Sequence, residues 1–126
     1  MIKPALTALI TTALVTSPAL AVDTTIQIEL GASSDFDRRV MVYDCAAEAP
    51  VTVTYINAAP NFLAVLPVPD EAEPRLFAAV IAGSGVRYAS GQWVWWTRGA
   101  DASLYDVTLG EDAEPVLTCS EINNTP

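Results

Sequence analysis

AGSGVRYASGQWVWWTRG, residues 82–99, holds all three tryptophans and four of the six glycines of this 126-residue chain. Glycines on both sides of Ser84 allow a tight turn there, because glycine adopts positive φ without strain. Residues 93–97 place bulky side chains on both faces of a strand, and Arg98 ends that strand beside Gly99. Aromatic side chains supply large, rigid contact area to a core or an interface. The stretch therefore predicts a turn that presents Ser84 and a strand that presents Arg98, and one partner could meet both.

Short β patterns lie on both sides of the turn around Ser84, which is interpreted as running from residue 83 to residue 92. Alternating apolar and polar side chains, or β-branched and aromatic runs, predict strands over residues 24–30, 38–45, 51–56, 62–66, 75–82, 93–97, 102–109 and 116–119. Three prolines in residues 67–74 exclude a central strand and predict an acidic surface loop. Eight short strands without a helical period predict an all-β meander. Closure into a barrel would remove the exposed edges of so small a sheet.

The amino terminus has the pattern of a secretory signal peptide. Lys3 precedes a mostly apolar run over residues 5–15, and residues 19–21 (Ala-Leu-Ala) match a small-x-small cleavage site. We expect residues 1–21 to be removed and residues 22–126 to form one domain. The apolar run is too short to span a membrane comfortably, and no cysteine at the cleavage site could carry a lipid. The sequence thus predicts a periplasmic protein without a membrane anchor.

The charge of the chain is strongly acidic. Fifteen carboxylates stand against six basic residues, and the formal net charge is −9. Loss of the leader removes Lys3 and leaves five arginines against 15 carboxylates, a balance of −10. Such a charge argues against nucleic acid as a partner and favours steering toward basic proteins. Solubility alone explains the charge equally well.

Two cysteines, Cys45 and Cys119, stand 74 positions apart. In an exported chain such a pair is typical of a disulfide, which would tie an early strand to the last one. The chain has no histidine and no Cys-x-x-Cys motif, so zinc and redox roles have no support, and we expect no metal or other cofactor.

No residue pattern indicates catalysis. Without histidine there is no imidazole base, and no Gly-x-Ser-x-Gly motif is present. Carboxylate pairs occur at residues 35 and 37, 70–71 and 111–112, but each pair lies in a predicted loop without an apolar pocket. A glycosidase needs two carboxyls in different environments on either side of one bond. We therefore expect no catalytic residues and a protein that is not an enzyme.

The motif Ser84-Gly85-x-x-Tyr88, followed by Trp-Trp-Thr-Arg-Gly at residues 95–99, resembles the signature of the bacterial inhibitors of c-type lysozyme. That family has periplasmic and membrane-bound members. The resemblance also takes in residues 43–45, 51–57 and 102–104 and Cys119, and so covers most of the chain after the leader. It implies an eight-stranded antiparallel β-barrel. One position departs from the pattern, because the family usually has lysine where this chain has Arg98, and the two cations bind differently.

The resemblance also implies a mechanism. The matching serine and cation of the family enter the lysozyme cleft and occupy its catalytic carboxyls, so Ser84 and Arg98 are expected to do so here. Gly85 and Tyr88 complete the predicted partner-binding set, with Tyr88 either a rim contact or a core residue. One alternative is a small periplasmic barrel that binds an apolar or sugar ligand inside, lined by the tryptophans; a weaker one is an envelope scaffold. The sequence leaves open whether the protein is a monomer or a homodimer.

Overall fold

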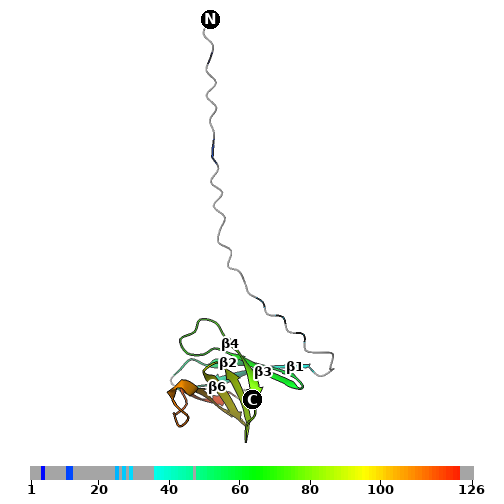
Figure 1. Cartoon of the computed structure of the whole chain (residues 1–126), viewed down its shortest axis with the longest axis vertical. Coiled ribbons are helices and arrows are strands. Elements are labelled where there is room, and N and C mark those ends of the chain that lie inside the picture. Colours follow the sequence, from blue (N-terminus) through cyan, green and yellow to red (C-terminus); the bar gives the residue numbers. More distant parts are fainter. Residues whose placement is uncertain are drawn as a thin grey trace.

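The computed structural model describes residues 36–46 and 48–122, together with positions 4, 11, 12, 25, 27 and 29. Eight antiparallel strands form a closed barrel in which each strand pairs with the next and the last pairs with the first (Figure 1). The strands are β1 (Phe36–Asp44), β2 (Val51–Ala58), β3 (Asn61–Leu66), β4 (Arg75–Val80), β5 (Val86–Ser90), β6 (Trp93–Arg98), β7 (Asp101–Asp106) and β8 (Leu117–Glu121). A single 3-10 turn, η1 (Val107–Leu109), follows β7. The predicted all-β, eight-stranded barrel is confirmed.

Two of the predicted strands, residues 24–30 and residues 102–109, differ from the strands that the structure shows. Positions 25, 27 and 29 are exposed and outside any strand, and the other positions of the predicted strand over residues 24–30 lie outside the described residues. The barrel instead contains the strand β5, which lies in the segment that the sequence analysis interpreted as a turn. The five residues of β5 include one buried side chain, Tyr88, so their inward-facing pattern is short and weak. The predicted strand over residues 102–109 also ends early, because the Asp106 carboxylate accepts from the Thr108 amide and caps η1.

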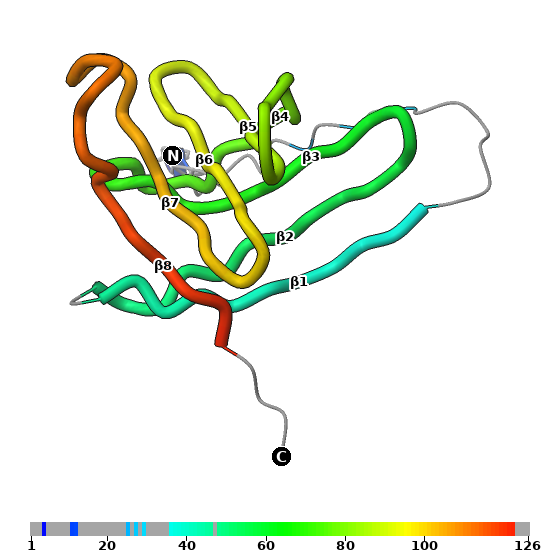
Figure 2. The backbone as a smooth tube through the Cα atoms, turned by 90° about the horizontal axis from the view of Figure 1, so that it is seen from below, coloured from blue at the N-terminus to red at the C-terminus, as the bar shows by residue number. Residues whose placement is uncertain are grey.

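The barrel closes where β8 meets β1. In Figure 2 the chain can be followed from β1 in cyan to β8 in red, which runs beside both β7 and β1. Only Tyr43–Glu121 and Asp44–Ser120 are paired across this seam, whereas β1 and β2 pair over eight positions. The Cys45–Cys119 disulfide lies next to it, with 4.0 Å between the two Cα atoms, and both cysteines are buried. The predicted disulfide is confirmed.

The interior is filled by large side chains that alternate inward along the strands. Trp95, Phe77 and Leu104 are fully buried, and Trp93 is nearly so. Trp96 points to the outer face of β6, as the alternation predicts. The Trp95 indole donates to the Tyr55 hydroxyl at 2.9 Å. The two inward tryptophans therefore pack in the core, and Trp95 is hydrogen-bonded there, at the positions where an internal ligand would need open space.

Three tyrosines extend this core. The hydroxyls of Tyr43 and Tyr55 share a hydrogen bond of 2.7 Å, and the rings of Tyr55 and Tyr88 are 5.6 Å apart. Burial raises the pKa of all three phenols above the ordinary value, so they stay neutral through the physiological range. Tyr88 is only 5% exposed. Of the two positions considered for Tyr88, rim or core, the structure shows the core.

Candidate functional site

Two connections meet at one end of the barrel, the β4–β5 loop (residues 81–85) and the β6–β7 hairpin. The register of β5 and β6 brings them together, because Val86 pairs with Thr97 and the chain continues back to Gly85 on one side and on to Arg98 on the other. The hairpin is tight, since Arg98 and Asp101 are themselves paired. Ser84 and Arg98 are both exposed at this end. Residues 14 positions apart in sequence thus share one surface.

Gly85 allows the loop to lie directly against β6. Its φ is +65°, and a Cβ placed on it would collide with the Thr97 carbonyl oxygen and lie 2.9 Å from Arg98 Cγ. Backbone atoms do not tolerate such an overlap, and positive φ strains any other residue. A glycine is therefore required here, and it sets Ser84 beside the end of β6.

Trp96 contacts both Ser84 and Arg98. Its indole Nε1–H donates to the Ser84 carbonyl oxygen at 2.8 Å, and the Arg98 guanidinium carbon lies 3.9 Å from the ring centroid. Among the described residues, no carboxylate lies within ion-pairing distance of Arg98. The cation is held over an aromatic face, where the quadrupole of the ring attracts it, and stays available to an external anion.

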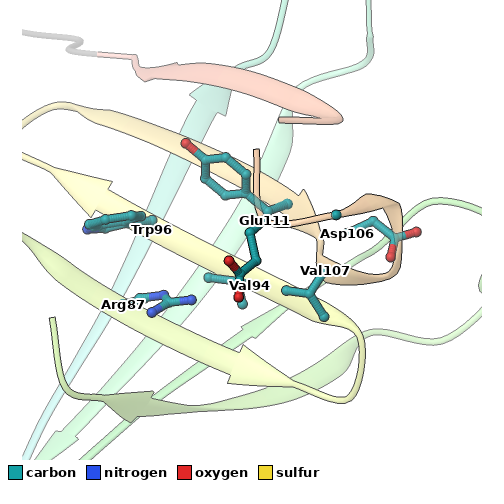
Figure 3. Close-up of a pocket in the computed structure, with 8 residues that line it drawn as sticks. Arg87, Val94, Trp96, Asp106, Val107 and Glu111 are labelled. Atoms are coloured by element: carbon teal, nitrogen blue, oxygen red, sulfur yellow. The ribbon is translucent and has the colours of Figure 1, made fainter. Parts of the chain in front are cut away.

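A second arginine lies on the same ring. The Arg87 guanidinium carbon is 5.4 Å from the Trp96 centroid, and Arg87 Nε is buried without a hydrogen-bond partner among the described residues. Both residues border a surface pocket of about 440 Å³, lined by Arg87, Val94, Trp96, Tyr105, Asp106, Val107, Gly110 and Glu111. Figure 3 shows Arg87 and Trp96 side by side on neighbouring strands, with Glu111 reaching across from the loop after η1. Arg87 thus lies beside a pocket that two carboxylates, Asp106 and Glu111, also line.

Residues 43–112, more than half of the chain, match the model of a family described as membrane-bound lysozyme-inhibitor of c-type lysozyme. The chain belongs to this family. A "Membrane-bound lysozyme inhibitor of C-type lysozyme" from Pseudomonas aeruginosa is 37% identical over 94 residues, which are 75% of this chain and 73% of the relative. A protein of the same description from Cupriavidus necator is 35% identical over 81 residues, 64% of this chain and 63% of the relative.

Two solved structures of this inhibitor family resemble the barrel. One is P. aeruginosa MliC, crystallised in complex with hen egg white lysozyme; its TM-score is 0.65 at 35% identity, over 80% of this chain and 99% of that one. The other is PliC-St, a periplasmic lysozyme inhibitor of C-type lysozyme from Salmonella typhimurium, with a TM-score of 0.56 at 25% identity over 69% and 100% of the two chains. The fold predicted from the family resemblance is thus that of its solved members.

Three of the four predicted partner-binding residues come together at this end of the barrel. Ser84, Gly85 and Arg98 lie around Trp96, whereas Tyr88 lies beneath them in the core. Sequence reasoning missed Arg87, which is placed by its pairing with Trp96 across β5 and β6. Recognising β5 as a strand would have found it.

Neither a metal centre nor a spanning helix is found in the part of the chain that the structure describes. No group of three histidine, cysteine, aspartate or glutamate side chains there could hold a metal ion. Within the same residues, no helix has the length and apolar character needed to cross a membrane.

Gly85→Ala should destabilise the protein, because the new Cβ would force the loop away from Thr97 and strain the backbone at positive φ. Such strained residues cost about 1–3 kcal/mol of unfolding free energy. Gly83→Ala is the matched control, since a Cβ at Gly83 would meet nothing within 4 Å; it should stay within about 0.5 kcal/mol of the parent. Urea unfolding of the three proteins measures both changes. Equal stability of the two variants would contradict the close approach of the loop to β6.

Proposed function

We propose that this protein inhibits c-type lysozyme by inserting Ser84 and Arg98 into the catalytic cleft of the enzyme. The observation that carries the proposal is the joint exposure of these two residues at one barrel end, connected through Trp96. Family membership supports it, and so does the P. aeruginosa relative, which was crystallised with hen egg white lysozyme.

The two side chains have the chemistry that such a cleft requires. A retaining glycosidase of this kind works through two carboxyl groups, one protonated and one ionised. The Ser84 hydroxyl can donate to an ionised carboxylate or accept from a protonated one. Arg98 can bond a carboxylate through two parallel N–H groups, and an arginine stays charged in any protein environment. Together they would occupy both members of the acid–base pair and exclude substrate.

The charge distribution suits a basic enzyme as the target. Excess carboxylates over the rest of the chain would steer a cationic protein toward this one and raise its association rate. In the proposed complex the exposed Arg98 would meet the carboxyls of the cleft, while Arg87 lies against the same Trp96 ring. The carboxylates of the inhibitor would thus provide the long-range attraction, whereas its arginine would make the local contact.

In this proposal the protein performs no reaction itself. Glu71, from one of the adjacent carboxylate pairs, serves the fold, because it accepts from Arg75 Nε at 2.8 Å and from the Trp93 indole at 3.0 Å. Asp106, beside the pocket, accepts from Thr108 and Gln92, and the hydrogen bond from the Thr108 hydroxyl leads the contacts that lower the pKa of this carboxyl. These carboxylates hold the acidic loop and η1 in place.

The test uses protein isolated from the periplasmic fraction of an expressing cell. Its mass should correspond to a chain that starts at Val22 without a lipid, a prediction that falls on residues outside the described ones. Added to c-type lysozyme in a peptidoglycan suspension, it should slow lysis in proportion to its molar ratio to the enzyme. Unchanged lysis at a large molar excess would refute inhibition. A lipid on the chain would refute only the free periplasmic state and would place it with relatives that are named membrane-bound.

A further inference from the structure

We propose that Trp96 is a positioning residue, which holds Ser84 and Arg98 in the arrangement that inhibition requires. The inference rests on the function proposed above and assigns a role to a side chain outside the predicted site. Trp96 is the side chain that contacts both inhibitory residues, one through its N–H and the other through its ring face.

The hydrogen bond fixes the loop. Ser84 lies in the β4–β5 connection, where both Ser84 and Ile81 are exposed, Ile81 to 96%. The Trp96 indole donates to the Ser84 carbonyl oxygen and ties the loop to β6, which is a rigid element of the barrel. This bond leaves the Ser84 hydroxyl free, because it uses the backbone of that residue.

The ring face fixes the cation. A free arginine side chain samples many rotamers, and ordering it on binding costs affinity. Stacking at 3.9 Å restricts Arg98 before the partner arrives. The indole is itself held, since Arg87 lies 5.4 Å from its centroid and the tilted Tyr105 ring lies 6.4 Å away. The ring can therefore act as a fixed surface on which Arg98 rests.

Trp96 is also separate from the elements that hold the fold together. It is half-buried on the outer face of β6, whereas the core uses Trp95 on the opposite face, which is fully buried. Replacement of Trp96 should consequently affect recognition more than folding.

The experiment measures lysozyme binding and inhibition for the parent, Trp96→Phe and Trp96→Leu. Trp96→Phe keeps an aromatic face for Arg98 and removes the N–H, so it should weaken binding less than Trp96→Leu, which removes both contacts. For Trp96→Leu we expect about a two- to tenfold loss, the range for one rotamer-rich side chain that is no longer pre-ordered. Phe62→Leu, a change of an exposed aromatic residue on β3, is the matched control and should bind like the parent.

A double-mutant cycle separates positioning from a merely structural role. In a Ser84→Ala/Arg98→Ala background, Trp96→Leu should weaken binding no further, because Trp96 acts through those two residues. In the free protein, the ring-current shift of the Arg98 side-chain protons should disappear in Trp96→Leu. A parent that inhibits lysozyme together with a Trp96→Leu variant that inhibits equally would overturn the inference and leave the proposed function intact. Full additivity in the cycle would also overturn it. A parent that does not inhibit would overturn both.

Discussion

Arg98→Ala is expected to weaken binding to c-type lysozyme by about thirty- to several-thousand-fold. In the proposed complex, the arginine would be buried against the carboxyls of the cleft, and truncation would leave a carboxylate desolvated without its partner. Loss of one member of such a pair commonly costs about 2–5 kcal/mol. In the free protein Arg98 is exposed and stacks on Trp96 without an ion pair to any described residue. The melting temperature should therefore change little.

Matched variants make this expectation specific. Ser84→Ala should cost less than Arg98→Ala, because neutral hydrogen bonds are weaker than charge-assisted ones. Arg98→Lys should be mild, since it keeps the charge and restores the usual family residue. Arg38→Ala removes an exposed arginine from the outer face of β1 and controls for the loss of one positive charge. Lysozyme inhibition and melting curves of all four variants decide the question. Parent-like inhibition by both Ser84→Ala and Arg98→Ala would exclude the insertion mechanism.

Cys45→Ser should lower the free energy of unfolding by about 2–5 kcal/mol, the usual cost of removing a native disulfide from a small secreted domain. The bond closes a loop with a sequence separation of 74, so the chain-entropy model gives about 4–5 kcal/mol. It also lies beside the seam where β1 and β8 share two pairs, the least extensive pairing in the barrel. One further backbone hydrogen bond crosses the seam, from the Ile122 amide to the Val42 carbonyl oxygen at 2.9 Å.

Denaturant unfolding measures this effect. The Cys45→Ser/Cys119→Ser double variant is the control, because it removes the bond without leaving a reactive thiol. Both variants should be destabilised to a similar degree, and a reducing agent should destabilise the parent but not the double variant. Unchanged stability of the double variant would contradict a stabilising role for the bond. Two titratable thiols in the native parent would show that the bond is not formed.

The class of fold followed from the sequence because most strands carry a clear alternation. On β6 the alternation put Trp95 and Trp96 on opposite faces, and the structure shows that the face of Trp95 is the core. β5 was missed because Val86–Ser90 is five residues long, lies between glycines and buries one side chain deeply. Residues 24–30 have a better alternation, yet positions 25, 27 and 29 lie outside any strand. Alternation shows which segments could face a core and leaves open which of them pair.

The sequence motif named the residues of the candidate site, but it did not show how the fold brings them together. The motif named Ser84 and Arg98, but their adjacency depends on the register of β5 against β6, which pairs Val86 with Thr97. The same register pairs Tyr88 with Trp95 and sends its side chain inward. It also pairs Arg87 with Trp96 and places a second cation on the outer face. Because β5 was not recognised as a strand, its register against β6 could not be predicted, and neither could these contacts.

The short seam between β1 and β8 also bears on when the molecule can fold. Tyr43 and Asp44 find their partners at Glu121 and Ser120, so the ring of strands cannot close until the chain has been synthesised through Glu121. Contacts between residues so distant in sequence form slowly, because closing the long loop between them lowers the chain entropy before the contact contributes any stabilising free energy. A nascent chain of this topology therefore stays open while the ribosome still holds β8.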